Sequence, residues 1–200
     1  MSWSDTIKRG DALIRRLELL PKLGPAAIAA WAAQRLMDAY VPSTDNSDEE
    51  LFIVGWNSAL ALLWKAMIEP SPAMDRNVRA RLANYYEGPH SYRLGGEPGE
   101  YSDNNTAAAA IYALEAYCDH GSKSASYAVQ RLLDASQRAK QNPERDLGPV
   151  TEEERRNWAL AMDKELGLLE ASLQIIEEAG VTPSSVRKMQ KALQLRARIA

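Results

Sequence analysis

The sequence is poor in the residues from which many catalytic and metal centres are built. Its 200 residues include one cysteine, Cys118, and two histidines, His90 and His120. A single cysteine cannot form an internal disulfide, so the chain is not a disulfide-stapled scaffold. A zinc site would have to recruit carboxylates, and none stands at a recognisable ligand spacing. The sequence therefore predicts no metal-binding residue and no cofactor.

Long hydrophobic runs are also missing. The longest, Ala26–Ala33 and Ala59–Trp64, fall far short of the roughly 20 residues that a membrane span needs. The opening residues MSWSDTIKRGD lack the apolar core and the cleavage site of a signal peptide. We expect a cytoplasmic protein with no membrane partner.

Neither sign of charge is in strong excess. The net charge is −3 and the isoelectric point is near 5.5, whereas a nucleic-acid-binding surface needs clustered positive charge. The charged runs Glu152–Arg156 and Arg187–Lys188 are typical of solvated helix surface, with a binding patch as the less favoured alternative. We therefore predict no nucleic-acid partner.

The residues that favour strands are scarce, and those that favour helices are abundant. Phenylalanine occurs once, at Phe52, and β-branched runs are nearly absent, while Ala, Leu, Glu, Arg and Lys fill the segments between Pro and Gly. Apolar residues recur at helical spacing in each segment. The pattern predicts an all-α fold: one domain over residues 1–200, built as a bundle of about eight helices.

The least regular stretch is GPHSYRLGGEPGEYSDN, residues 88–104, which we predict to be a long Gly/Pro-rich loop. At its end, Asp103, Asn104 or Asn105 is suited to cap the N-terminus of the next helix. The same polar cluster offers oxygen ligands for a hard cation, but calcium loops spread their acidic ligands more widely, so capping is the favoured interpretation. Further along, Thr151 and Glu154 fit a capping box.

No set of residues forms a recognisable catalytic motif. Cys118 and His120 are two apart and point to different sides of a helix, so a packed, inert thiol is favoured. The Glu87-x-x-His90 match is interrupted by Gly88-Pro89, which breaks the helix that a metal-binding bundle needs. An acid pair inside the bundle remains as an alternative; the candidate carboxylates are Glu115, Asp119, Asp163, Glu165 and Glu170.

Tryptophan is comparatively frequent. Trp31, Trp56, Trp64 and Trp158 fall in periodic apolar segments and are predicted core residues. Trp3 precedes the first periodic stretch. It either latches the N-terminus onto the body, which we favour, or anchors a partner surface.

Several segments, taken in order, resemble a known family. They are LELLPKLGPAAIAAWAAQRLMDAY, WNSALALLW, TAAAAIYALEAY, YAVQRLLDA and RRNWALAMDKELGLLEASLQIIEEAG. Together they are similar to the YjaG-like bacterial family of unknown function, over roughly residues 17–186. Similar alanine-rich helical domains occur among immunity proteins of bacterial polymorphic toxin systems, which bind a cognate toxin in the cytosol. Neither family brings a catalytic motif.

The resemblance implies a non-catalytic protein-binding domain, and the leading hypothesis is an immunity protein that neutralises a cognate toxin. The candidate partner-binding residues are His90, Tyr92, Arg93 and Tyr101, because Tyr and Arg on an exposed loop are effective in protein interfaces. The alternative for these residues is that they fold back over the bundle. The alternative functions are a helical protein acting as a homodimer or other homo-oligomer, and an enzyme with a buried carboxylate site.

Overall fold

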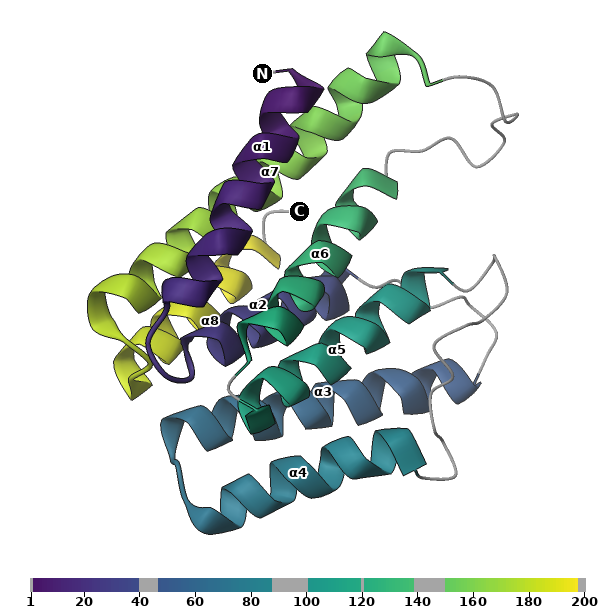
Figure 1. Cartoon of the computed structure of the whole chain (residues 1–200). Coiled ribbons are helices and arrows are strands. Elements are labelled where there is room, and N and C mark those ends of the chain that lie inside the picture. The colour runs from purple at the N-terminus through teal and green to yellow at the C-terminus, as the bar shows by residue number, and fades with distance from the viewer. Residues whose placement is uncertain (1, 40–46, 88–100, 120, 139–149, 198–200) are drawn as a thin grey trace.

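Helices account for every regular element in the described part of the chain. The structure is a computed structural model that describes residues 2–39, 47–87, 101–119, 121–138 and 150–197. These residues form eight α-helices and one short 3-10 turn (Figure 1), which confirms the predicted all-α bundle. The elements are α1 (Trp3–Arg16), η1 (Leu17–Leu19), α2 (Gly24–Ala39), α3 (Ser47–Ile68), α4 (Pro72–Glu87), α5 (Tyr101–Asp119), α6 (Ser122–Arg138), α7 (Glu152–Ala179) and α8 (Pro183–Ala197).

Helix α2 lies at the centre of the bundle. Every residue from Gly24 to Ala33 is buried, so this helix is covered on all sides. It packs against α3, α5, α6, α7 and α8. Small side chains allow these helices to approach closely. In α5 the run Ala107–Ala110 is also buried.

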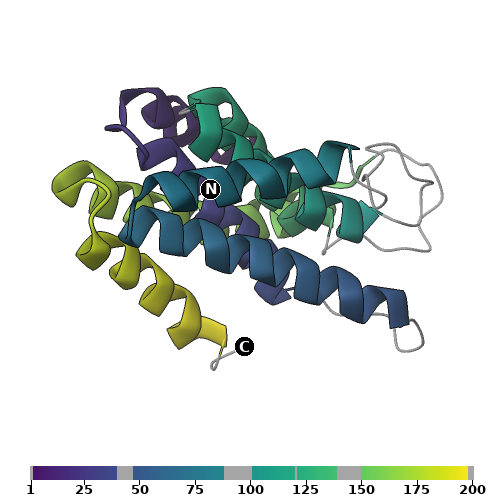
Figure 2. The same cartoon turned by 90° about the horizontal axis from the view of Figure 1, so that it is seen from below.

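Two further helix pairs surround this centre. Helices α3 and α4 run side by side along one edge of the molecule (Figures 1 and 2), where the rings of Trp56 and Tyr85 stack with centroids 4.0 Å apart. Helix α1 lies along α7 although the two are far apart in sequence. Gly10 of α1 is buried between Leu133 of α6 and Leu166 of α7. One contiguous apolar cluster joins all these elements.

The predicted capping box at the start of α7 is confirmed. The backbone N–H of Glu154 donates to Thr151 Oγ1 at 3.2 Å, and the N–H of Thr151 donates to Glu154 Oε2 at 2.7 Å. Gly180 ends the same helix with a φ of 62°, in the region that favours glycine. Ser2 and Asp5 form a second capping box at the start of α1, which the sequence analysis missed.

The predicted boundary before α5 is wrong. The helix begins at Tyr101, so the loop does not extend to residue 104, and Asp103, Asn104 and Asn105 are helical residues and not its N-cap. The physical reason is that Ser, Asp and Asn are tolerated throughout the first helical turn, where an acidic residue also interacts favourably with the helix dipole. Residue type alone therefore does not determine which residue precedes the helix and which residues form its first turn. Residues 88–100 lie outside the described residues.

Trp3 latches the N-terminus onto the body of the protein, as predicted. Its ring meets that of Trp158 edge to face, with centroids 5.8 Å apart and an interplanar angle of 65°. The four other tryptophans are buried in the core, as predicted.

Candidate partner-binding surface

Three of the four predicted partner-binding residues lie outside the residues that the structure describes. His90, Tyr92 and Arg93 are outside the described residues, and Tyr101 is the first residue of α5. Their assignment therefore stays a prediction. Because Tyr101 begins α5, the surface considered next is that of the hairpin formed by α5 and α6.

A pair of tyrosines lies on that hairpin. Tyr112 of α5 and Tyr127 of α6 contact each other with ring centroids 5.2 Å apart and an interplanar angle of 47°. Tyr127 is 45% exposed. The ammonium group of Lys123, one turn before Tyr127, lies 5.9 Å from the centroid of its ring. We call Tyr112, Lys123 and Tyr127 the tyrosine patch.

The packing of the hairpin leaves Tyr127 exposed and Tyr112 partly buried. In α5 the buried residues Ile111, Ala113 and Leu114 surround Tyr112 in sequence, and in α6 the buried residues Ala125 and Ala128 flank Tyr127. The two helices are tied near their turn, where Ser124 Oγ donates to Glu115 Oε2 at 3.0 Å. With the inner faces filled by these residues, Tyr127 lies at the surface of the hairpin, while Tyr112 is partly buried and also packs against the apolar core.

The patch has the chemistry of a protein interface. Tyrosine offers a large, rigid contact area with a hydroxyl group at its tip, and it is enriched among residues that dominate binding energy. Lys123 adds a cation that an incoming carboxylate can meet. The sequence analysis missed both rings, although the helical spacing that placed Leu114 and Ala128 inward also placed Tyr112 and Tyr127 away from them.

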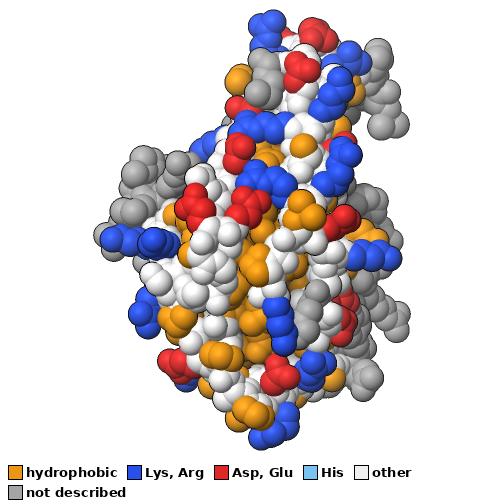
Figure 3. Space-filling model, turned by 60° about the vertical axis from the view of Figure 1, so that its left-hand side comes forward, with side chains coloured by type: hydrophobic (Ala, Val, Ile, Leu, Met, Phe, Trp, Pro, Cys, Tyr) orange, Lys and Arg blue, Asp and Glu red, His pale blue; other side chains and the backbone are white. Residues whose placement is uncertain are grey.

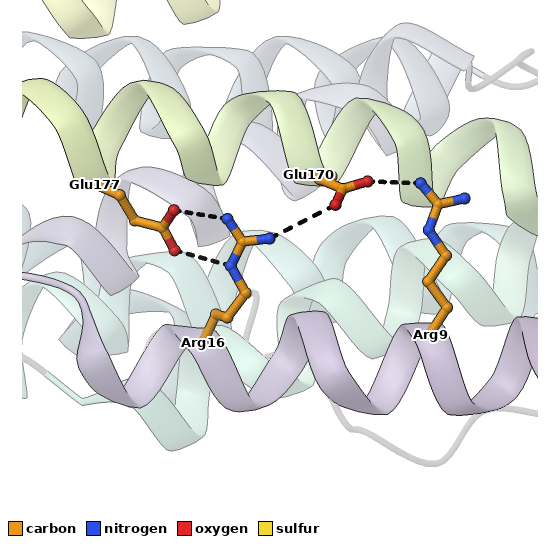
Figure 4. A network of polar contacts seen from close by, with 4 residues as sticks. All are labelled: Arg9, Arg16, Glu170 and Glu177. Atoms are coloured by element: carbon orange, nitrogen blue, oxygen red, sulfur yellow. Dashed lines mark hydrogen bonds and ion pairs between the residues drawn. The ribbon is translucent and has the colours of Figure 1, made fainter.

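The candidate carboxylates on α7 face arginines. Arg9 of α1 pairs with Asp163 and, at 2.7 Å, with Glu170. Arg16 pairs with Glu177 at 2.6 Å and reaches Glu170 at 3.8 Å (Figure 4). We call these five residues the α1–α7 ladder. Its hydrogen bond from Arg16 lowers the pKa of Glu177 and raises that of the arginine.

Glu165, another candidate for an acid pair, is bound by Arg35 of α2. Arg35 Nη2 donates to Glu165 Oε1 at 2.6 Å and Nε donates to Oε2 at 3.2 Å. The side chains are only 17% and 10% exposed. This largely buried, bidentate pair has the geometry of a structural contact between α2 and α7. Among the described residues, no group of three or more His, Cys, Asp and Glu side chains is arranged to hold a metal ion.

The cysteine is packed inside the bundle, as predicted. Cys118 is 6% exposed, and burial raises the pKa of its thiol. Burial also raises the pKa of the neighbouring Tyr117 to about 12. The thiol is therefore protonated at neutral pH and weakly nucleophilic. Arg79 of α4 donates to the carbonyl oxygen of Cys118 at 2.8 Å, which satisfies a backbone group at the end of α5.

The surface around α1 and α7 carries both signs of charge. Figure 3 shows positive and negative side chains interspersed over the upper part of the molecule, with hydrophobic atoms between them. None of the helices in the described ranges is long and apolar enough to cross a membrane.

Comparison with protein families, with curated proteins and with solved structures finds no match to this chain.

Proposed function

We propose that this protein is a non-catalytic protein-binding domain, and specifically an immunity protein that binds and neutralises a cognate bacterial toxin. The observation that carries the proposal is the tyrosine patch, in which exposed Tyr127 contacts partly buried Tyr112 and has a cation beside it on the α5–α6 hairpin. The likeness of the sequence to helical immunity proteins gives the class of partner. The predicted contacts His90, Tyr92, Arg93 and Tyr101 precede or begin the same hairpin in sequence, and they remain separate candidates for partner binding.

The arrangement of the candidate carboxylates on α7 supports a binding role over an enzymatic one. Asp163, Glu165 and Glu170 each face an arginine across a helix interface. An arginine beside a carboxylate favours its charged form and occupies its oxygens. These acids are thereby suited to holding helices together.

Co-expression tests the proposal directly. The wild-type chain is produced together with the product of the gene immediately upstream, and growth and co-purification are measured. We expect growth to be rescued and a stable complex to form. If the wild type neither rescues growth nor co-purifies, the immunity proposal is wrong.

Variants of the tyrosine patch test where the toxin binds. We expect Y112A/Y127A to weaken the complex by about thirtyfold or more, because truncating an aromatic at the centre of an interface removes about 2 kcal/mol or more. The control is V54A/L160A, which truncates two aliphatic side chains that are each 66% exposed and lie outside the patch. Equal binding by Y112A/Y127A and the control would place the contact elsewhere.

Self-association through the same patch is the second candidate function. The exposed ring of Tyr127, which already contacts Tyr112, can stack on the same ring of a second copy about a twofold axis. Light scattering of the purified chain decides this point. A dimer that Y112A/Y127A converts to a monomer supports it, and a wild-type monomer excludes it at the concentration measured.

A further inference from the structure

The last helix carries charge of one sign only. Between Val181 and Ala200 the sequence contains lysines and arginines but no aspartate or glutamate. Among the residues of α8 whose side chains the structure describes, 183–193, the basic ones are Arg187, Lys188 and Lys191, and all three are exposed. They follow one another at helical spacing, so they form one basic stripe.

The inner face of α8 is buried in the hydrophobic core. Val186, Met189 and Leu193 are buried, and the helix packs on α2, α3 and α7. A helix whose apolar face is already buried cannot lay that face into a lipid surface. The basic stripe is therefore the surface that α8 offers to a partner.

The three cations form no ion pair within the described residues, in contrast to Arg9, Arg16 and Arg35. Three described acids on α2 and α7, two of the helices that α8 packs against, interact with other residues. Glu177 of α7 pairs with Arg16. Glu178 of α7 and Asp38 of α2 accept hydrogen bonds from Gln174 and Gln34 of their own helices. The positive charge on α8 is thus left for an external anion.

We propose that the outer face of α8 is a docking site for an extended acidic segment of a protein partner. Arg187 and Lys191 are separated by a rise of about 6 Å along the helix. Alternate side chains of an extended peptide are spaced about 7 Å apart. An extended segment with carboxylates at alternate positions therefore matches both cations. A nucleic acid is a less suitable partner. The chain has a net charge of −3, which repels a polyanion that extends beyond the basic stripe.

This site is separate from the tyrosine patch. Helix α8 lies on one side of the molecule and α6 on the other (Figures 1 and 2). The docking of an acidic segment on α8 therefore does not depend on the proposed immunity function.

The test uses the purified chain and a fluorescein-labelled peptide of alternating glutamate and serine, with binding followed by fluorescence anisotropy. We expect saturable binding that weakens as salt is raised, because these charges are exposed. R187E/K188E/K191E is expected to bind at least about tenfold more weakly. The matched control is K8E/K22E/K164E, which makes the same change in net charge at three exposed lysines outside α8 and is expected to keep most of the affinity.

Three outcomes would overturn the proposal. These are no binding of the acidic peptide by the wild type, equal loss in the control variant, and tighter binding of single-stranded DNA or anionic vesicles than of the peptide through the α8 residues. Circular dichroism checks that each variant is folded. If the charge reversal impairs folding, R187Q/K188Q/K191Q replaces it, with the same expected direction.

Discussion

Gly24 occupies a position where a side chain does not fit. A Cβ atom placed there would lie 2.7 Å from Leu20 Cβ and 3.2 Å from Ile176 Cγ2. Leu23 just before it has a φ of 67°, in the left-handed region that few non-glycine residues adopt. The turn from η1 into α2 is therefore pressed against α7, and glycine allows this approach.

Replacing glycine by alanine should have opposite effects at two positions. G24A is expected to lower the free energy of unfolding by about 1 to 3 kcal/mol, because the new methyl group overpacks the turn. G167A is expected to raise it by about 0.5 to 1 kcal/mol, because Gly167 lies within α7 with open space where the methyl group goes. Urea unfolding of both variants measures the difference. Equal effects would contradict the packing described at Gly24.

Trp158 has the only buried side-chain nitrogen or oxygen atom without a hydrogen-bond partner among the described residues, its indole Nε1. A buried donor left unpaired costs about 1 to 3 kcal/mol. W158F removes the donor along with part of the ring, so we expect the two effects to offset and stability to change by less than about 1 kcal/mol. Thermal and urea unfolding test this. A loss above about 2 kcal/mol would indicate that the indole N–H is satisfied in solution.

At the scale of whole elements, the buried pair Arg35–Glu165 joins α2 to α7. R35M leaves the Glu165 carboxylate buried without its partner, which is expected to cost about 3 to 5 kcal/mol. The double variant R35M/E165M removes both charges and should be more stable than R35M. A double-mutant cycle based on urea unfolding measures this coupling. The cycle is completed by E165M. If the loss of stability in R35M/E165M equals the sum of the losses in R35M and E165M, the pair is not coupled as the structure indicates.

The α1–α7 ladder makes docking of α1 sensitive to acid. Arg16 holds the pKa of Glu177 below its ordinary value of 4.5, so this carboxylate stabilises the fold fully above that value. The contribution is lost as the pH falls through the lower, folded-state pKa. E177Q should therefore be less stable than the wild type at pH 7, and the difference should shrink at acid pH. R16Q should behave in the same way. Parallel loss of stability in wild type and E177Q would contradict this linkage.

Sequence patterns predicted the type of the elements better than where they begin. Thr151 and Glu154 fixed the start of α7, because both halves of a capping box were present at the required spacing. Before α5 several polar residues stand in a row, and each of them suits a first turn as well as a cap. The position at which α5 begins, Tyr101, depends on how the whole helix packs. No single residue in the sequence indicates that packing.

The candidate surface was only partly accessible to sequence reasoning. Tyr and Arg in a glycine-rich segment suggested a binding site at residues 90–101. The contact between Tyr112 and Tyr127 depends on how α5 and α6 pair, and their sequence separation gives no direct sign of it. In the same way, the arginines that engage Asp163 and Glu165 come from α1 and α2, distant in sequence.

At the scale of the whole molecule, one shared core implies cooperative unfolding. Buried tryptophans report on different helices: Trp31 on α2, Trp56 and Trp64 on α3, and Trp158 on α7. Because a single apolar cluster connects these helices, we expect the unfolding curves from tryptophan fluorescence and from far-ultraviolet circular dichroism to coincide. A fluorescence transition at lower denaturant than the loss of helix would show that part of the bundle opens first.

The parallel alignment of α1 with α7 has a consequence for biosynthesis. Arg9 and Asp163 are separated by 154 positions along the chain, so α1 is synthesised long before α7, the helix that it packs against. Until then, Leu13 and Leu17, both buried in the finished protein, have no α7 to cover them. We therefore expect the α5–α6 hairpin, whose helices are adjacent in sequence, to fold early. Translation rate and chaperone binding should matter most for the N-terminal segment.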